Sequence, residues 1–356
     1  MQLINTTSVP VSTDIVGTHR DQQRALILTA KATFTIAANG EVQLDRDSPY
    51  PLYNEDQPTE LGIQPRDNLP RLDPVFEVML LAKAYPPLGQ AVTQMKVSLR
   101  VGDDYHEIDV LGDRVWQGEG DKAKISAPNS FESMPLTWEH AFGGAMEVLV
   151  DREAVLEVSS PMNTAGKGFD HISRARELGD VFQCPEGYPQ FENTRFLPNL
   201  EDPTQRVMKW DDDPLPICWA PVDHSSGLII ERFRRSCERR GEGHISMVAP
   251  EMLHRAHPDW VIQVPDPGAM VRLEGACSTG VLEFCLPELR VVADFKNAEA
   301  VSQLELLPRS LLLLAEERKF VLIYRCVTKF AYTEGLELAA RIRLLKGWST
   351  KMDGVH

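Results

Sequence analysis

Short runs that alternate apolar with polar or small residues, each bounded by turn residues, recur along the chain and constrain its fold more than any other feature. The clearest is 25–44, ALILTAKATFTIAANGEVQL, where Asn39-Gly40 supplies the positive φ angles of a tight hairpin turn. Later runs with the same pattern are 75–84, 91–101 and 105–110. The first third of the chain is therefore expected to be rich in β-strands.

The carboxy-terminal third returns to this pattern after Met252. Strands are expected in WVIQV, MVRLEGA, GVLEFCLP and VVADF, and the segment 304–330 predicts a second long hairpin that turns at 316–319. A helix over 310–317 is the alternative there. Strands and helices do not alternate at regular spacing, which disfavours a doubly wound parallel sheet. The expected fold is mainly β, with antiparallel sandwich or barrel-like sheets and a few short helices; an α+β fold is the alternative.

The chain divides into a β-rich part at 1–120, an irregular middle at 121–245 and a second β-rich part at 246–356. The middle is dense in glycine, proline and aromatic residues, and one short helix is expected near 171–178. No linker separates the parts, so we expect one intimately joined unit. The loop 48–74 carries six prolines, and long ordered loops of this kind often carry function.

Charge and cysteine usage exclude several classes of partner and compartment. The 356 residues include 52 acidic and 37 basic side chains, a formal charge of −15, which repels nucleic acid and anionic membranes. The six cysteines form no C-x-x-C pair, and no run approaches the roughly 20 apolar residues of a spanning helix. The amino terminus has neither a basic leader nor a long apolar stretch. We expect a soluble, cytoplasmic protein.

The sequence motifs that would indicate catalysis are incomplete or missing. The segment 163–169, NTAGKGF, resembles a phosphate loop but has Pro161 and Gly168 where that motif needs a glycine and a hydroxyl residue. No G-x-S-x-G elbow is present. We therefore expect no enzyme and no cofactor. The alternative is a hydrolase whose site includes His140, Asp113 and other polar residues of the middle region.

A metal site at Glu251, His254 and His257 is disfavoured because the second Glu-x-x-His of carboxylate-bridged sites is missing and Pro258 would end a helix there. Surface or capping histidines are the preferred interpretation.

An arginine-rich helix is expected over 226–240, with Ser225 or Ser226 as its cap and Gly241 at its end. Its basic face stands out on an acidic protein and is a candidate surface for an acidic partner. A solvated face that pairs with acids of the same chain is the alternative. The candidate partner-binding residues on this face are Arg232, Arg235 and Arg239.

Aromatic residues gather after the strand that ends near Leu111, where a turn at Gly112-Asp113 precedes an arginine and an indole. In 134–144, MPLTWEHAFGG, a short helix would place two aromatics on one face and stop at the two glycines. These side chains are either partner anchors or a buried structural motif. The candidate anchors are Arg114, Trp116, Trp138 and Phe142.

Four blocks resemble a family of domains of unknown function encoded beside bacterial type VI secretion genes, some members of which are adaptors that load toxic effectors onto the secreted VgrG spike. The blocks are 109–116 (DVLGDRVW), 134–144 (MPLTWEHAFGG), 163–169 (NTAGKGF) and 197–203 (LPNLEDP), with a weaker echo at 304–325. The chain departs from the family in having Trp138 and His140 in place of tyrosine and arginine, and Thr164 and Lys167 in place of proline and arginine. An extra hairpin is expected at 147–161.

The resemblance implies a non-catalytic adaptor that binds a type VI effector in the cytoplasm and aids its loading onto the spike. Its expected partners are that effector and the VgrG spike protein, with no nucleic acid and no membrane. Two alternatives stay open: a structural accessory that remains in the secretion apparatus, and the hydrolase named above. The oligomeric state is left open.

Overall fold

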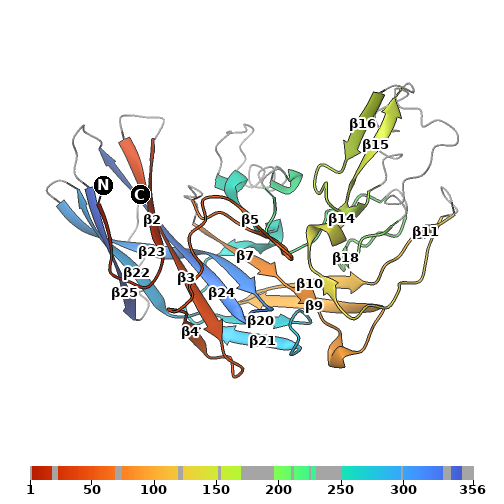
Figure 1. Cartoon of the computed structure of the whole chain (residues 1–356), viewed down its shortest axis with the longest axis horizontal. Coiled ribbons are helices and arrows are strands. Elements are labelled where there is room, and N and C mark those ends of the chain that lie inside the picture. The colour runs from red at the N-terminus through yellow and green to blue at the C-terminus, as the bar shows by residue number, and fades with distance from the viewer. Residues whose placement is uncertain are drawn as a thin grey trace.

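A computed structural model describes residues 2–17, 23–68, 74–118, 123–150, 154–169, 196–209, 212–223, 226–229, 250–297, 300–331 and 338–346. These residues form a mainly β fold built from one large and one smaller sheet (Figure 1), as the alternating pattern predicts. No helix within these ranges is long and apolar enough to cross a membrane.

The larger sheet has ten strands and is nearly closed: its path begins on β1 and ends on β2, and these two strands lie near each other. Along that path lie β1 (Gln2–Asn5), β25 (Leu338–Lys346), β22 (Leu289–Asn297), β23 (Ala300–Leu314), β24 (Lys319–Ala331), β3 (Gln23–Ile36) and β2 (Val11–Gly17). Three more strands join from the side: β4 (Val42–Leu44), β7 (Val75–Leu81) and β19 (Val261–Gln263). Most neighbours are antiparallel, but β7 runs parallel to β23 and β1 runs parallel to β25.

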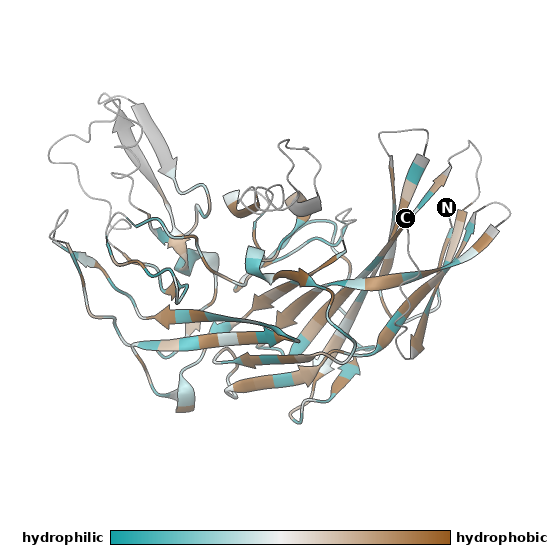
Figure 2. Cartoon of the chain, turned by 180° about the vertical axis from the view of Figure 1, so that it is seen from behind, coloured by the Kyte–Doolittle hydropathy of each residue, from teal (hydrophilic) through white to brown (hydrophobic). Residues whose placement is uncertain are grey.

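The smaller sheet has five strands in the order β18 (Leu200–Glu201), β10 (Asp104–Leu111), β9 (Gln94–Val101), β20 (Met270–Glu274) and β21 (Val281–Cys285). Hydrophobic and hydrophilic residues are interspersed along the strands (Figure 2), and the buried hydrophobic side chains of both sheets form one continuous core. A column of stacked rings, with centroids 4.9 and 4.6 Å apart, joins β3, β24 and β21 through Phe34, Phe320 and Phe284. The two sheets therefore share one hydrophobic core.

Both predicted hairpins are confirmed. In the first, β3 pairs with β4 through a turn in which Gly40 has φ of 83°. In the second, β23 pairs with β24 through the turn at 315–318. The helical alternative for 310–317 is wrong, because 310–314 are strand residues that pair with both β24 and β7. Tertiary pairing on two sides outweighs the helix propensity of the leucine run.

Strands from the first and last thirds of the chain share both sheets. In the larger sheet β3 pairs with β24 over its whole length, and in the smaller sheet β9 pairs with β20. The middle of the chain supplies short two-stranded pieces that gather beyond one end of β9 and β10 (Figure 1). These pieces are β11 (Trp116–Gln117) with β12 (Lys124–Ile125), β14 (Phe142–Gly143) with β17 (Lys167–Gly168), and β15 (Ala145–Val150) with β16 (Ala154–Ser159). The last pair confirms the extra hairpin.

The expected helix at 134–144 is wrong. Only Trp138–His140 forms one turn of 3-10 helix, and the residues on either side of it are extended. Phe142 instead joins β14, which pairs in parallel with β17, and Gly143 and Gly144 have φ of 143° and 126°. Trp138 and Phe142 therefore do not share a helix face.

Two histidine predictions have different outcomes. His257 caps the 3-10 helix at Pro258–Trp260, where its ring accepts a hydrogen bond from the backbone N–H of Asp259. His254 is buried rather than at the surface, because it follows the short helix at Pro250–Leu253 into the core.

Two predicted helices lie mostly outside the described residues. Of the arginine-rich helix, 227–229 are helical, and Ser226 caps the start by accepting from the N–H of Leu228. Arg232, Arg235 and Arg239 lie outside the described residues, as does the helix expected near 171–178.

Candidate functional site: a polar junction of four sequence blocks

Four blocks that are separated in the sequence meet just beyond the end of β10. Backbone hydrogen bonds tie them together: Leu197 N–H donates to Arg114 O, Asn199 N–H to His140 O, and Lys167 N–H to Ala141 O. We call the polar side chains at this meeting point the junction. Its members are Asp113, Arg114, His140, Lys167, Asn199 and Glu201.

Asn199 is fully buried at the centre of the junction. Its amide nitrogen donates to Leu111 O at 2.9 Å and to Asp113 Oδ1 at 3.0 Å, so its oxygen must face the remaining neighbour, His140 Nδ1, at 2.9 Å. That nitrogen therefore carries the proton, and Nε2 of the neutral ring holds the lone pair. One amide thus links an aspartate to a histidine of defined tautomer.

The two titratable groups that Asn199 links are shifted for different reasons. The hydrogen bond from Asn199 lowers the pKa of Asp113, and Lys167, whose Nζ lies 3.4 Å from Asp113 Oδ1, acts in the same direction. Burial lowers the pKa of His140, against the opposing effect of Asn199. At neutral pH the junction therefore holds an ionised carboxylate and a neutral imidazole.

The burial of the His140 imidazole predicts that the stability of the protein depends on pH. Because the pKa of His140 is lowered below its usual 6.5, the unfolded chain takes up the proton first, so stability is lost as pH falls below about 6.5. We expect the wild type to lose more thermal stability between pH 7.5 and 5.5 than a His140→Gln variant does. Calorimetry at several pH values measures this difference. Parallel pH profiles for the two proteins would contradict it.

Two members of the junction, Arg114 and Glu201, form a buried ion pair. Arg114 donates to Glu201 Oε1 at 2.9 Å and to Pro198 O at 2.7 Å, and both charged side chains are less than a tenth exposed. Burial raises the pKa of Glu201, and Arg114 opposes that rise. The pair joins the turn after β10 to the block that contains β18.

A family model described as an uncharacterized protein conserved in bacteria, DUF2169, matches residues 21–325. The chain belongs to the DUF2169 family. All four blocks of the junction and the first long hairpin lie inside the matched range, which ends within β24. No curated protein and no solved structure is significantly similar to the chain.

In this DUF2169 protein the two glycines after Phe142 lie very close to the backbone of residues 163–166. A Cβ at Gly143 would lie 2.1 Å from Asn163 O. The Asn163 amide in turn donates to Trp138 O at 2.8 Å and to Phe142 O at 3.0 Å. Glycine is therefore required at 143 both for its φ of 143° and for this contact.

We expect Gly143→Ala to destabilise the protein by about 2–4 kcal/mol, because it adds backbone strain and a steric overlap. Gly89→Ala is the matched control. Gly89 also has a positive φ, 65°, but a Cβ added there would meet nothing within 4 Å. Gly89→Ala is therefore expected to lower the free energy of unfolding by about 1 kcal/mol. Urea unfolding of both variants measures the difference, and equal losses would contradict a steric role for Asn163.

The four candidate anchors divide by exposure. Arg114 is 7% exposed and Phe142 3%, and both hold the junction together, whereas Trp116 and Trp138 are half-buried. The Trp138 indole donates to Ala220 O and Pro221 O, both at 3.1 Å. Trp116 and Trp138 are thus the two candidates that keep surface for a partner. Asn199 and Glu201 lie in the block 197–203, but no local pattern in the sequence predicts their roles, which depend on partners far away in the chain.

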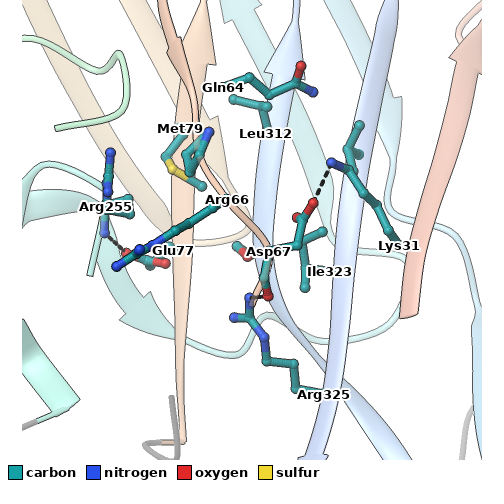
Figure 3. Close-up of a pocket in the computed structure, with 13 residues that line it drawn as sticks. Lys31, Gln64, Arg66, Asp67, Glu77, Met79, Arg255, Leu312, Ile323 and Arg325 are labelled. Carbon is teal, nitrogen blue, oxygen red and sulfur yellow. Dashed lines mark hydrogen bonds and ion pairs between the residues drawn. The ribbon is translucent and has the colours of Figure 1, made fainter. Parts of the chain in front are cut away.

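A second buried polar cluster lies where strands β3 and β24 of the large sheet meet the loop 48–74 (Figure 3). Lys31, in the middle of β3 and only 1% exposed, forms an ion pair with Asp67 at 2.8 Å. Asp67 O accepts from Arg325 at 2.9 Å, and its carboxylate also accepts from the N–H of Tyr53 at 2.8 Å. Burial lowers the pKa of Lys31, and Asp67 opposes that shift.

This cluster fastens the proline-rich loop to the sheet. Tyr53 and Asp67 come from the loop, whereas Lys31 and Arg325 come from β3 and β24. The cavity beside them holds about 30 Å³, room for one or two waters rather than a ligand. The ring of Tyr53 covers the Lys31 ammonium, with Nζ 4.3 Å from its centroid. The arrangement is that of a structural clamp, and the lysine inside an apolar run is its signal in the sequence.

Proposed function

We propose that this DUF2169 protein is a non-catalytic adaptor that binds a type VI secretion effector in the cytoplasm and aids its loading onto the VgrG spike. The observation that carries the proposal is the junction. The blocks on which the resemblance rests come together in space, and their polar side chains bind one another and the backbone. Such a network favours a rigid recognition surface over a reactive centre.

The half-buried tryptophans are the proposed anchors. Trp116 packs against the small apolar cluster of Phe142, Phe169, Leu197 and Val207 at the junction. A large aromatic side chain held by its neighbours loses little conformational freedom on binding, which is why such residues dominate interface energies. Trp138 is fixed instead by its indole N–H, which is shared between the carbonyl oxygens of Ala220 and Pro221.

Co-expression with the effector and the spike protein encoded beside the gene tests the proposal. We expect both to co-elute with the adaptor in size-exclusion chromatography, and Trp116→Ala to weaken effector binding at least about tenfold, or about 1.4 kcal/mol. Tyr105→Ala, which removes an exposed aromatic from β10, is the control and should leave affinity unchanged. If neither protein co-elutes, the adaptor proposal fails. Stoichiometric presence in isolated secretion apparatus would favour a structural accessory instead.

A hydrolase is the second candidate, and one observation favours it. The Asn199 amide connects Asp113 to His140 and leaves the lone pair on Nε2, as a general base requires. Against it, His140 makes no hydrogen bond to a serine or cysteine within the part of the chain that the structure describes. Turnover of ester, amide or phosphoester substrates that His140→Gln abolishes would decide for this candidate.

A further inference from the structure

A pocket of about 330 Å³ opens between the proline-rich loop and the turn of the second hairpin. Its apolar wall consists of Leu61, Leu81 and Leu314, of which the last two are buried. Three carboxylates line it as well, those of Glu60, Glu316 and Glu317, all on exposed residues. The volume suits one long side chain or a small ligand. This acidic pocket is separate from the junction.

Two tyrosines orient the carboxylates of the turn. Tyr50 Oη donates to Glu317 Oε1, and Tyr85 Oη donates to Glu316 Oε2, both at 2.6 Å. Burial raises the pKa of Tyr50, and raises that of Tyr85 to about 12, so both hydroxyls keep their protons at neutral pH. Within the described residues, the second oxygen of each glutamate accepts no hydrogen bond. Two fixed carboxylates therefore present open acceptors.

A buried amide without a partner also faces the pocket. Gln64 is 5% exposed and lines the acidic pocket, and its side-chain amide has no hydrogen-bond partner in the described part of the chain. In Figure 3 it lies at the opposite end of the clamp from Arg325. The atom buried without a partner is its Nε2, and its amide oxygen, which accepts no hydrogen bond from the described residues, is the end that a donor in the pocket can use.

Charge and shape together define the occupant. Three carboxylates stand against one ammonium in the lining, that of Lys83, so the pocket favours a cation. The leucine wall suits an aliphatic stem. A guanidinium offers five donors in a planar fork, enough to reach two carboxylates and an amide oxygen at once, whereas an ammonium offers three.

We propose that the acidic pocket binds an arginine side chain of a partner protein. The stem lies on Leu61, Leu81 and Leu314, and the guanidinium donates to Glu316, Glu317 and the Gln64 amide oxygen. The inference rests on the proposed adaptor function for the identity of that partner, which would be the effector or the spike protein.

The test uses the full chain and a blocked peptide, acetyl-Gly-Arg-Gly-amide, with the uncharged citrulline peptide as its isostere. Methyl NMR should show saturable shifts of the Leu61, Leu81 and Leu314 methyl groups with the arginine peptide and at least tenfold weaker binding of the citrulline peptide. Glu316→Gln/Glu317→Gln should also weaken arginine binding at least tenfold. The glutamine oxygens still accept from Tyr50 and Tyr85, so this variant should fold normally.

Glu132→Gln/Glu288→Gln is the matched control, because it removes the same charge at exposed residues outside the pocket and should change binding less than twofold. Absence of saturable shifts, or equal shifts with citrulline, would overturn the inference. That failure is distinct from failure of the adaptor proposal, which co-elution with the effector and spike decides by itself. Co-elution that persists in Glu316→Gln/Glu317→Gln with undiminished affinity would also overturn the assignment of the arginine to these partners.

Discussion

Replacing Asp67 with alanine is expected to lower the free energy of unfolding by about 3–5 kcal/mol. The change leaves the Lys31 ammonium in the interior without its carboxylate, since Lys31 Nζ lies 2.8 Å from Asp67 Oδ2 and both side chains are less than a tenth exposed. It also removes the acceptor of the Tyr53 N–H. Urea unfolding followed by circular dichroism measures the loss.

Two further variants separate charge from packing. Asp47→Ala, at an exposed position near the same loop, should change stability by less than about 0.5 kcal/mol. Lys31→Met/Asp67→Leu should recover most of the loss, because well-packed apolar residues can replace a buried ion pair. If Asp67→Ala loses no more free energy of unfolding than Asp47→Ala, the clamp contributes nothing to stability.

Glu201→Ala is expected to lower the free energy of unfolding by a similar amount, about 3–5 kcal/mol, because it leaves the Arg114 guanidinium buried in the junction without its carboxylate. Pro198 O remains as an acceptor for Arg114, but it carries no charge to balance the cation. Calorimetric unfolding measures the loss. Since the pair joins two of the four blocks, effector binding should fall in the same variant if the junction supports the recognition surface.

Arg114→Met/Glu201→Leu is the control for this experiment. It removes both charges and keeps side-chain volume, so stability should return to within about 1–2 kcal/mol of the wild type. If the double variant is as unstable as Glu201→Ala, the effect comes from packing around β18 rather than from an unpaired charge. If it is stable and still binds the effector, Arg114 acts as a positioning residue and not as a contact.

The candidate site could be predicted only in part. The four blocks were recognisable as sequence, and the turn at 112–113 placed Arg114 and Trp116 just beyond a strand end, as found. The hydrogen bonds of Asn199 could not be predicted, because they join residues 59 and 86 positions away in the chain. The expected helix at 134–144 failed for the same reason: the pairing of β14 with β17 outweighed the local helical spacing of two aromatics.

The sequence by itself determined the strands and their turns, because alternation with period two and glycine at positive φ act within a few residues. Both hairpins and most strand positions follow from that. Only the tertiary structure decided which strands pair, such as β7 with β23, and where a buried lysine meets its carboxylate. Those choices depend on contacts between distant segments, whose free energies are gained only when the whole core assembles, so no local pattern records them.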